Sequence, residues 1–155
     1  MFLDGLEDAY EEGRAMGTFA QDTANEYQLT REEMDAYSIE SLRRANAAIE
    51  NGAFAGEVVP VTFSTRAGEV TVEHDEQPGK GKPDKIPTLR PAFAKDGTIT
   101  AATSSSISDG AAAVVLTRES VAEKNGQTPV ARIVAMAAHA QAPSEFTVAP
   151  VGAIN

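Results

Sequence analysis

The chain contains no cysteine and no tryptophan, and only two of its 155 residues are histidines. The absence of cysteine excludes disulfide bonds and a thiol nucleophile within this sequence. With two histidines and no cysteine, a zinc site is not expected, and we predict no bound metal. No uninterrupted apolar run reaches the roughly 18 residues that a membrane-spanning helix needs, so we also predict no membrane partner.

Basic residues are scarce as well. The sequence has 13 Lys and Arg against 23 Asp and Glu, which gives a formal net charge of -10. Residues 1–57 hold thirteen of the acids and four arginines, a net of -9, and all five lysines lie beyond position 79. Because nucleic-acid binding needs a basic face, we exclude a nucleic-acid partner. The acidic N-terminus lacks the basic region of a signal peptide, and we expect a cytoplasmic location.

The residues that are present indicate a globular chain, since 42% of them are hydrophobic. Apolar residues at helical spacing predict helices over Met1–Gly13 and Met16–Tyr27. A third helix follows Thr30, because Thr30 and Glu33 have the spacing of a capping box. We expect this helix to end at Asn51-Gly52.

The remainder of the chain predicts strands and a long loop. Val58–Ser64 and Glu69–Glu73 form an expected hairpin, followed by an extended loop over 74–87 that is rich in proline and glycine. An interior strand is expected at Ala111–Leu116, a helix at Arg118–Lys124 and a second strand at Val130–Ala138, with Ser144 capping a final helix. This order of elements indicates an α/β or an α+β fold.

Five hydroxyl side chains lie just before the predicted interior strand: Thr103, Ser104, Ser105, Ser106 and Ser108. Such residues compete for backbone hydrogen bonds and favour a loop. A polar loop beside a buried strand is a common place for ligand contacts, and an ordinary capped loop is the alternative.

Lysines gather in the stretch rich in proline and glycine, at positions 80, 82 and 85. Their ammonium groups suit phosphate, and a solvated loop is the alternative. Composition and spacing therefore predict either an anionic-ligand loop or a solvated loop, and they indicate no particular reaction.

Many short motifs resemble those of the thiolase family, in particular the acetyl-CoA acetyltransferases. In chain order they are Met16-Gly17-Thr18, Leu29–Glu33 with Asp35–Tyr37, Glu57–Val61, Asp75-Glu76, Leu89–Phe93, Asp96–Ala101, Ser108–Ala113, Ala131–Val134 and Ala149–Val151. One such motif is weak, but this many in order at family-like spacing form a specific match over nearly the whole chain.

The resemblance implies a partial thiolase fold, in which a loop domain inserted in the first of two α/β halves covers coenzyme A. It assigns residues 1–15 to the end of the N-terminal half and 16–108 to the loop (lid) domain, which is helical with a β-hairpin. Residues 109–128 are then the last strand and helix of that half, and 129–155 the start of the C-terminal half. The strand–helix–strand piece belongs to a larger layered α/β/α core.

The resemblance also implies a set of coenzyme A contacts. Ser105 matches the serine that contacts the pantetheine arm. Lys85 and Lys80 fall where the family contacts the nucleotide end. The apolar lining of the coenzyme tunnel matches Leu6, Met16, Ala92, Phe93, Ala101 and Ile107. Ala15 and Ala102-Thr103 stand where relatives often carry histidine and Gly-Asn, so no acyl-chain preference is predicted.

The implied activity is acyl transfer between coenzyme A thioesters by Claisen condensation or thiolysis. The family uses two cysteines and a histidine that find no match here, so we expect no catalytic residue in this chain and no activity from it alone. The implied partners are an acyl-CoA thioester as substrate, the remainder of a thiolase polypeptide and further copies in a homodimer or homotetramer. No covalently bound cofactor is expected. The alternative is a non-catalytic coenzyme A-binding or interaction module.

Overall fold

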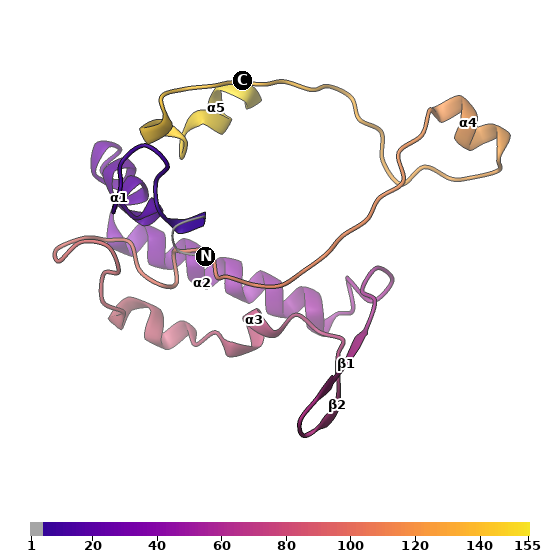
Figure 1. Cartoon of the computed structure of the whole chain (residues 1–155), viewed down its shortest axis with the longest axis horizontal. Helices are drawn as coiled ribbons and strands as arrows, with labels where there is room; N and C mark the ends of the chain where they lie inside the picture. Colours follow the sequence, from indigo (N-terminus) through magenta and orange to yellow (C-terminus); the bar gives the residue numbers. More distant parts are fainter. Residues whose placement is uncertain (1–4) are drawn as a thin grey trace. The chain divides into compact units, whose positions relative to one another are not determined.

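The protein is described by a computed structural model that covers residues 5–155. Its elements are shown in Figure 1. The chain forms two compact units, Met1–Ser105 and Ser106–Asn155, which are described separately.

A tight loop precedes the first helix of the N-terminal unit. Residues 8–14 do not form the α-helix that periodicity predicted over Met1–Gly13, so that expectation is wrong for the described part, and residues 1–4 lie outside the described residues. The Asp8 carboxylate accepts hydrogen bonds from the N–H groups of Tyr10 and Glu11, at 2.9 and 2.7 Å. These local bonds compete with helical ones, and Gly13 adopts a φ of 81°.

Two helices follow, α1 (Met16–Glu26) and α2 (Arg31–Glu50), and both confirm the predicted positions. Phe19 and Ala24 of α1 are buried, and the Arg14 guanidinium lies 3.7 Å from the centre of the Phe19 ring. The predicted capping box of α2 is present, because Thr30 and Glu33 exchange side-chain and backbone hydrogen bonds.

The predicted hairpin is confirmed as strands β1 (Val61–Thr65) and β2 (Gly68–Val72), which pair antiparallel. One face carries Val61, Phe63, Val70 and Val72, and the other carries Thr62, Ser64, Glu69 and Thr71. In Figure 1 the hairpin points away from the end of α2. Both faces are largely exposed.

The stretch expected to be one extended loop over 74–87 contains two short helices, so this expectation is wrong in detail. Helix α3 (Glu76–Lys80) begins where the Asp75 side chain accepts a hydrogen bond from the Gln77 N–H. A 3-10 helix, η2 (Pro83–Thr88), follows. Both pack on α2, and Figure 1 shows this segment running alongside it.

The C-terminal unit contains helix α4 (Glu119–Lys124), a 3-10 turn η3 (Pro143–Glu145) and helix α5 (Ala149–Ile154). The predicted helix at 118–124 is confirmed, with Arg118 and not Thr117 at its cap position. Ser144 does not cap α5, whose cap position is Val148.

The strands predicted at Ala111–Leu116 and Val130–Ala138 are not formed in this unit. Val114, Val115 and Leu116 are 82%, 91% and 74% exposed. A strand needs a hydrogen-bonded neighbour, and residues 106–155 contain no strand with which either segment pairs. The apolar segments therefore lie uncovered.

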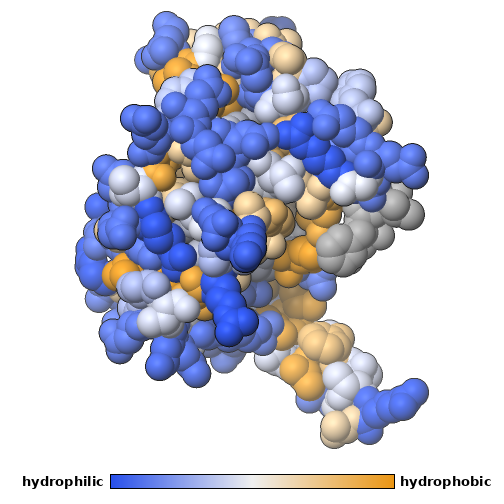
Figure 2. Space-filling model, turned by 90° about the vertical axis from the view of Figure 1, so that its left-hand side faces the viewer, coloured by the Kyte–Doolittle hydropathy of each residue, from blue (hydrophilic) through white to orange (hydrophobic). Residues whose placement is uncertain are grey.

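Hydrophilic residues dominate the face drawn in Figure 2, with smaller patches of hydrophobic ones between them. Within residues 5–155, no helix combines the length and apolar character needed to cross a membrane.

Candidate functional site

The hydroxyl-rich loop begins with a tightly bonded turn around Thr100, which is fully buried. The Thr103 hydroxyl accepts a hydrogen bond from the Thr100 N–H at 2.8 Å and lies 3.2 Å from the Thr100 carbonyl oxygen. The Ser104 hydroxyl donates to the same carbonyl at 2.8 Å. Thr103 and Ser104 thus use their hydroxyls to hold the turn.

Ser105 differs from its neighbours. Ser106 and Ser108 place their hydroxyl oxygens 3.0 Å apart. Ser105 is exposed, and its hydroxyl makes no hydrogen bond to any residue in the part of the chain that the structure describes. Among the five hydroxyl side chains of the loop, Ser105 therefore has the one left for a ligand, judged within residues 5–155.

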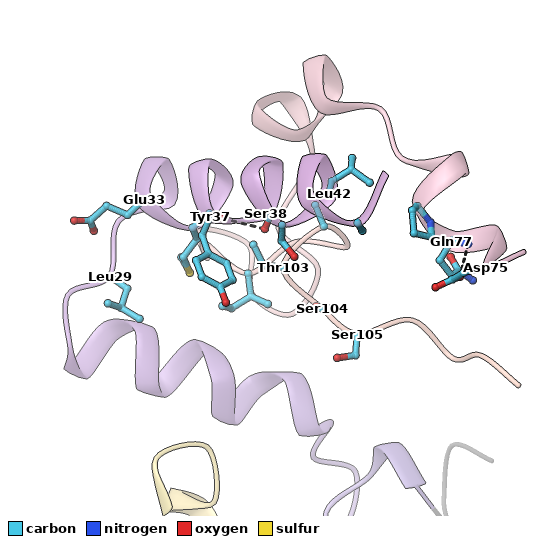
Figure 3. A pocket seen from close by; sticks show the side chains of 16 residues that line it. Leu29, Glu33, Tyr37, Ser38, Leu42, Asp75, Gln77, Thr103, Ser104 and Ser105 are labelled. Atoms are coloured by element: carbon cyan, nitrogen blue, oxygen red, sulfur yellow. Dashed lines mark hydrogen bonds between the residues drawn. The ribbon is translucent and has the colours of Figure 1, made fainter. Parts of the chain in front are cut away.

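A groove of about 780 Å³ lies between this loop and α2, and Ser105 lines it. Figure 3 shows Tyr37 and Ser38 on the α2 side, Thr103–Ser105 on the loop side, and Asp75 and Gln77 at one end. The other lining residues are Leu29, Glu33, Met34, Ser41, Leu42, Ala45, Pro78, Ile99 and Ala102.

Two acidic side chains, Glu33 and Asp75, line the groove, and none of its lining residues is basic. Hydrogen bonds from the Thr30 backbone N–H and then from its hydroxyl lower the pKa of Glu33, which keeps this carboxylate charged. A groove with apolar walls, hydroxyls and two carboxylates suits a slender neutral ligand and disfavours phosphate.

Gln21 of α1, which the sequence analysis did not identify, connects this helix to the residues just before the hydroxyl-rich loop. Its side chain is buried, and its Oε1 accepts hydrogen bonds from the N–H groups of Thr98 (2.8 Å) and Ile99 (3.2 Å). Its position three residues before the buried Ala24 places it on the inner face of α1, which was the available signal. Its partners are 77 and 78 residues away, so no local pattern reveals them.

Two of the predicted tunnel motifs meet beside this connection. A Cβ added at Gly17 would overlap the Phe93 ring, so the ring rests on the helix backbone next to Met16. The Ala92 N–H donates to the Ile99 carbonyl at 2.8 Å. The structure thus brings the Met16-Gly17 and Ala92-Phe93 pairs together, beside the segment that leads into the hydroxyl-rich loop.

The predicted lining residues do not all share the groove. Leu6 and Met16 are half-buried, whereas Ala92, Phe93 and Ala101 are exposed, and of the predicted contacts only Ser105 lines the groove. Ile107 is 60% exposed and belongs to the C-terminal unit.

The predicted basic contacts lie on the elements that pack against α2. Lys80, at the end of α3, has its ammonium nitrogen 3.9 Å from a carboxylate oxygen of Glu76. Lys85 is exposed on η2, and no carboxylate pairs with it among residues 5–155. Neither lysine lines the groove. No group of three or more histidine, aspartate or glutamate side chains placed to hold a metal occurs in the same residues.

Comparison with known proteins places these features in a family. The thiolase N-terminal domain family matches residues 1–120. A probable acetyl-CoA acetyltransferase of Dictyostelium discoideum is 47% identical over 152 residues, which are 97% of this chain and 36% of that protein. The chain thus spans little more than a third of the length of this relative.

Solved structures agree and confirm the partial α/β thiolase fold. The acetyl-CoA acetyltransferase of Bacillus anthracis matches with a TM-score of 0.88 and 37% identity, over 96% of this chain and 38% of that one. The Acat5 thiolase of Ascaris suum, solved in complex with coenzyme A, matches with a TM-score of 0.85 and 44% identity, over 97% and 38% of the two chains. The chain described here therefore belongs to the thiolase family.

Proposed function

We propose that this chain is the coenzyme A-binding lid of an acetyl-CoA acetyltransferase, which transfers acyl groups between coenzyme A thioesters by Claisen condensation or thiolysis. The observation that carries the proposal is the unbonded Ser105 hydroxyl at the edge of the groove. The pantetheine arm carries amide N–H and C=O groups, and a hydroxyl is able to donate to the one or accept from the other. Binding of coenzyme A by the Ascaris suum thiolase supports the same ligand here.

The distribution of charge supports a division of the ligand between two surfaces. The groove next to Ser105 holds Glu33 and Asp75 and so disfavours phosphates. Lys85 is exposed on η2, away from any carboxylate partner in residues 5–155. We infer that Ser105 contacts the pantetheine arm, here called the tether, and that Lys85 contacts the nucleotide end of coenzyme A. Lys80 is inferred to bind the nucleotide end more weakly, because its ammonium group lies close to the Glu76 carboxylate. The apolar residues Leu6, Met16, Ala92, Phe93, Ala101 and Ile107 are proposed to line the tunnel.

The bond-making residues are proposed to lie outside this chain. Acyl transfer through an enzyme-bound thioester needs a thiolate nucleophile, and the sequence has no cysteine. In this proposal residues 16–108 bind and orient the coenzyme, and the flanking residues join the layered core of a complete homodimer or homotetramer. The cytoplasmic location stays a prediction. The alternative is a non-catalytic coenzyme A-binding or interaction module, with which the absence of cysteine is equally compatible.

A titration of coenzyme A into the 155-residue chain tests the lid. We expect binding, and we expect Ser105→Tyr to weaken it by about tenfold or more because a bulky ring enters the space of the tether. Ser106→Tyr, which places the same ring one residue further along, is the matched control and is expected to change affinity less. Failure of the wild-type chain to bind would sink the lid proposal.

The two candidate functions are distinguished by an assay of acetoacetyl-CoA thiolysis, carried out on the chain joined to the remainder of a thiolase polypeptide. With the 155-residue chain alone we expect no turnover. Turnover by this polypeptide would show that its catalytic groups are present after all. Turnover by the joined polypeptide favours the enzyme. Binding of coenzyme A by that polypeptide without turnover favours the binding module.

A further inference from the structure

The side-chain amide of Gln21 has all of its hydrogen-bonding capacity in use. The oxygen accepts from two backbone N–H groups, of Thr98 and Ile99. The nitrogen donates to Asn25 Oδ1 at 3.0 Å and to Thr98 Oγ1 at 3.2 Å. A buried amide with both lone pairs and both hydrogens engaged fixes the position of the groups it joins.

The hydrogen bonds of Gln21 hold the residues that lie immediately before the hydroxyl-rich loop in the sequence. Ile99 is followed by the buried Thr100, whose N–H and carbonyl are bonded by Thr103 and Ser104. This bonded turn leads straight into Ser105, so a shift at Thr98 or Ile99 is passed through it to the Ser105 hydroxyl. The space is also closed on the other side, because a Cβ at Gly97 would overlap Gln21 Oε1.

We propose that Gln21 is a positioning residue. It fixes the Thr98–Ser105 segment against α1, and it thereby sets the position at which Ser105 contacts the pantetheine arm of the coenzyme. The inference rests on the proposed function of Ser105. It assigns Gln21 to the tether and not to the nucleotide end, since Lys85 is held by a separate connection. That connection runs from α2, where the Arg31 guanidinium donates to the Ile86 carbonyl at 2.9 Å.

The test uses the 155-residue chain and two probes, pantetheine and adenosine 3′,5′-bisphosphate. Gln21→Met keeps the length of the side chain and removes its hydrogen bonds. We expect its dissociation constant for pantetheine to rise by about fivefold to tenfold, the equivalent of one or two lost hydrogen bonds, with that for the bisphosphate changed by less than about twofold. Gln127→Met, at an exposed position of the C-terminal unit, is the matched control.

Gln21→Glu is the conservative variant, because its carboxylate keeps an acceptor for the Thr98 and Ile99 N–H groups and Asn25 is able to turn its amide to donate. We expect it to bind pantetheine more tightly than Gln21→Met. Amide hydrogen exchange reports the cause directly: Thr98 and Ile99 should lose protection in Gln21→Met while the interior of α2 keeps it.

The outcomes separate two failures. If wild type binds neither probe, the proposed function falls, and this inference with it. If wild type binds pantetheine and a folded Gln21→Met binds it equally well, or loses both probes to the same degree, the positioning role alone is overturned. If Gln21→Met does not fold, Gln21→Glu decides: near wild-type affinity with protected Thr98 and Ile99 amides supports the role, and weak pantetheine binding with those amides protected contradicts it.

Discussion

Individual side chains in this protein divide into those used inside the fold and those left for solvent or a ligand. Thr103 and Ser104 look like Ser105 in the sequence, yet their hydroxyls are bonded to the Thr100 backbone. The same distinction separates the lysines, since Lys80 faces Glu76 and Lys85 has no such partner within residues 5–155. Residue type alone therefore does not identify the contacts; the bonding of each group does.

Charge reversal at Lys85 tests this distinction. We predict that Lys85→Glu weakens the binding of adenosine 3′,5′-bisphosphate to the chain by about tenfold, since a charge-assisted bond to phosphate is lost and replaced by repulsion. Lys80→Glu should have a smaller effect, because Glu76 already offsets that charge. Titration calorimetry at low and moderate salt measures both. An equal loss in the two variants would point to a diffuse charge effect in place of a contact at Lys85.

In a complete enzyme the same change is expected to raise KM more than it lowers kcat, because the nucleotide end does not react. A change in kcat alone would contradict the assignment of Lys85 to this end of the coenzyme.

At the scale of single elements, helix α2 lines the groove and also packs against α3 and η2, which carry Lys80 and Lys85. Its exposed surface carries Glu40, which bonds Arg43 at 2.7 and 2.8 Å and Arg44 at 2.6 Å. Hydrogen bonds from Arg43 and then Arg44 lower the pKa of Glu40 from 4.5 to about 2. The folded helix thus holds this carboxylate ionised in acid that protonates it in the unfolded chain.

The sign of the pH effect follows from that shift. Because the pKa of Glu40 is lower in the folded state, its contribution to stability is present above pH 4.5 and is lost as the pH falls toward about 2. We predict that the stability difference between wild type and Glu40→Gln, measured by urea unfolding, shrinks over this interval. Glu50→Gln removes the same charge from α2 at a position without an ion pair in the described residues, and is the control. A difference that stays constant with pH would contradict the prediction.

Elements with local causes were predictable from the sequence. The capping box at Thr30 and Glu33 and the alternation through Val70 and Val72 each act within a few residues, and both elements were found as expected. Helix α3 was missed because its five residues include proline and glycine, which conceal the cap supplied by Asp75. Gln21 was missed because its bonding partners lie far along the chain.

At the scale of the whole molecule, the C-terminal unit carries more apolar sequence than it buries. Val115 and Val134 are 91% and 84% exposed, in segments whose β-branched composition predicted interior strands. The composition favours strands, but a strand also requires a neighbour, which no local pattern supplies. The chain spans 36% of the length of the Dictyostelium discoideum relative.

Hydrogen exchange tests this view of the C-terminal unit. We predict that the amides of 111–116 and 130–138 in the 155-residue chain exchange at the rates of an unstructured peptide, because no strand pairs with them in residues 106–155. The interior amides of α2 serve as the protected reference. Protection of 111–116 comparable to that of α2 would show that these residues find a strand partner, and would restore the prediction made from sequence.

One close contact in the N-terminal unit links the mutational histories of two distant positions. The Phe93 ring rests on the bare backbone of Gly17, where a methyl group has no room. A larger residue at position 17 therefore requires the exposed Phe93 ring to move aside or to be replaced by a smaller side chain. The two positions are thus expected to vary together, and a survey of variants should find larger residues at 17 enriched where position 93 has lost its aromatic ring.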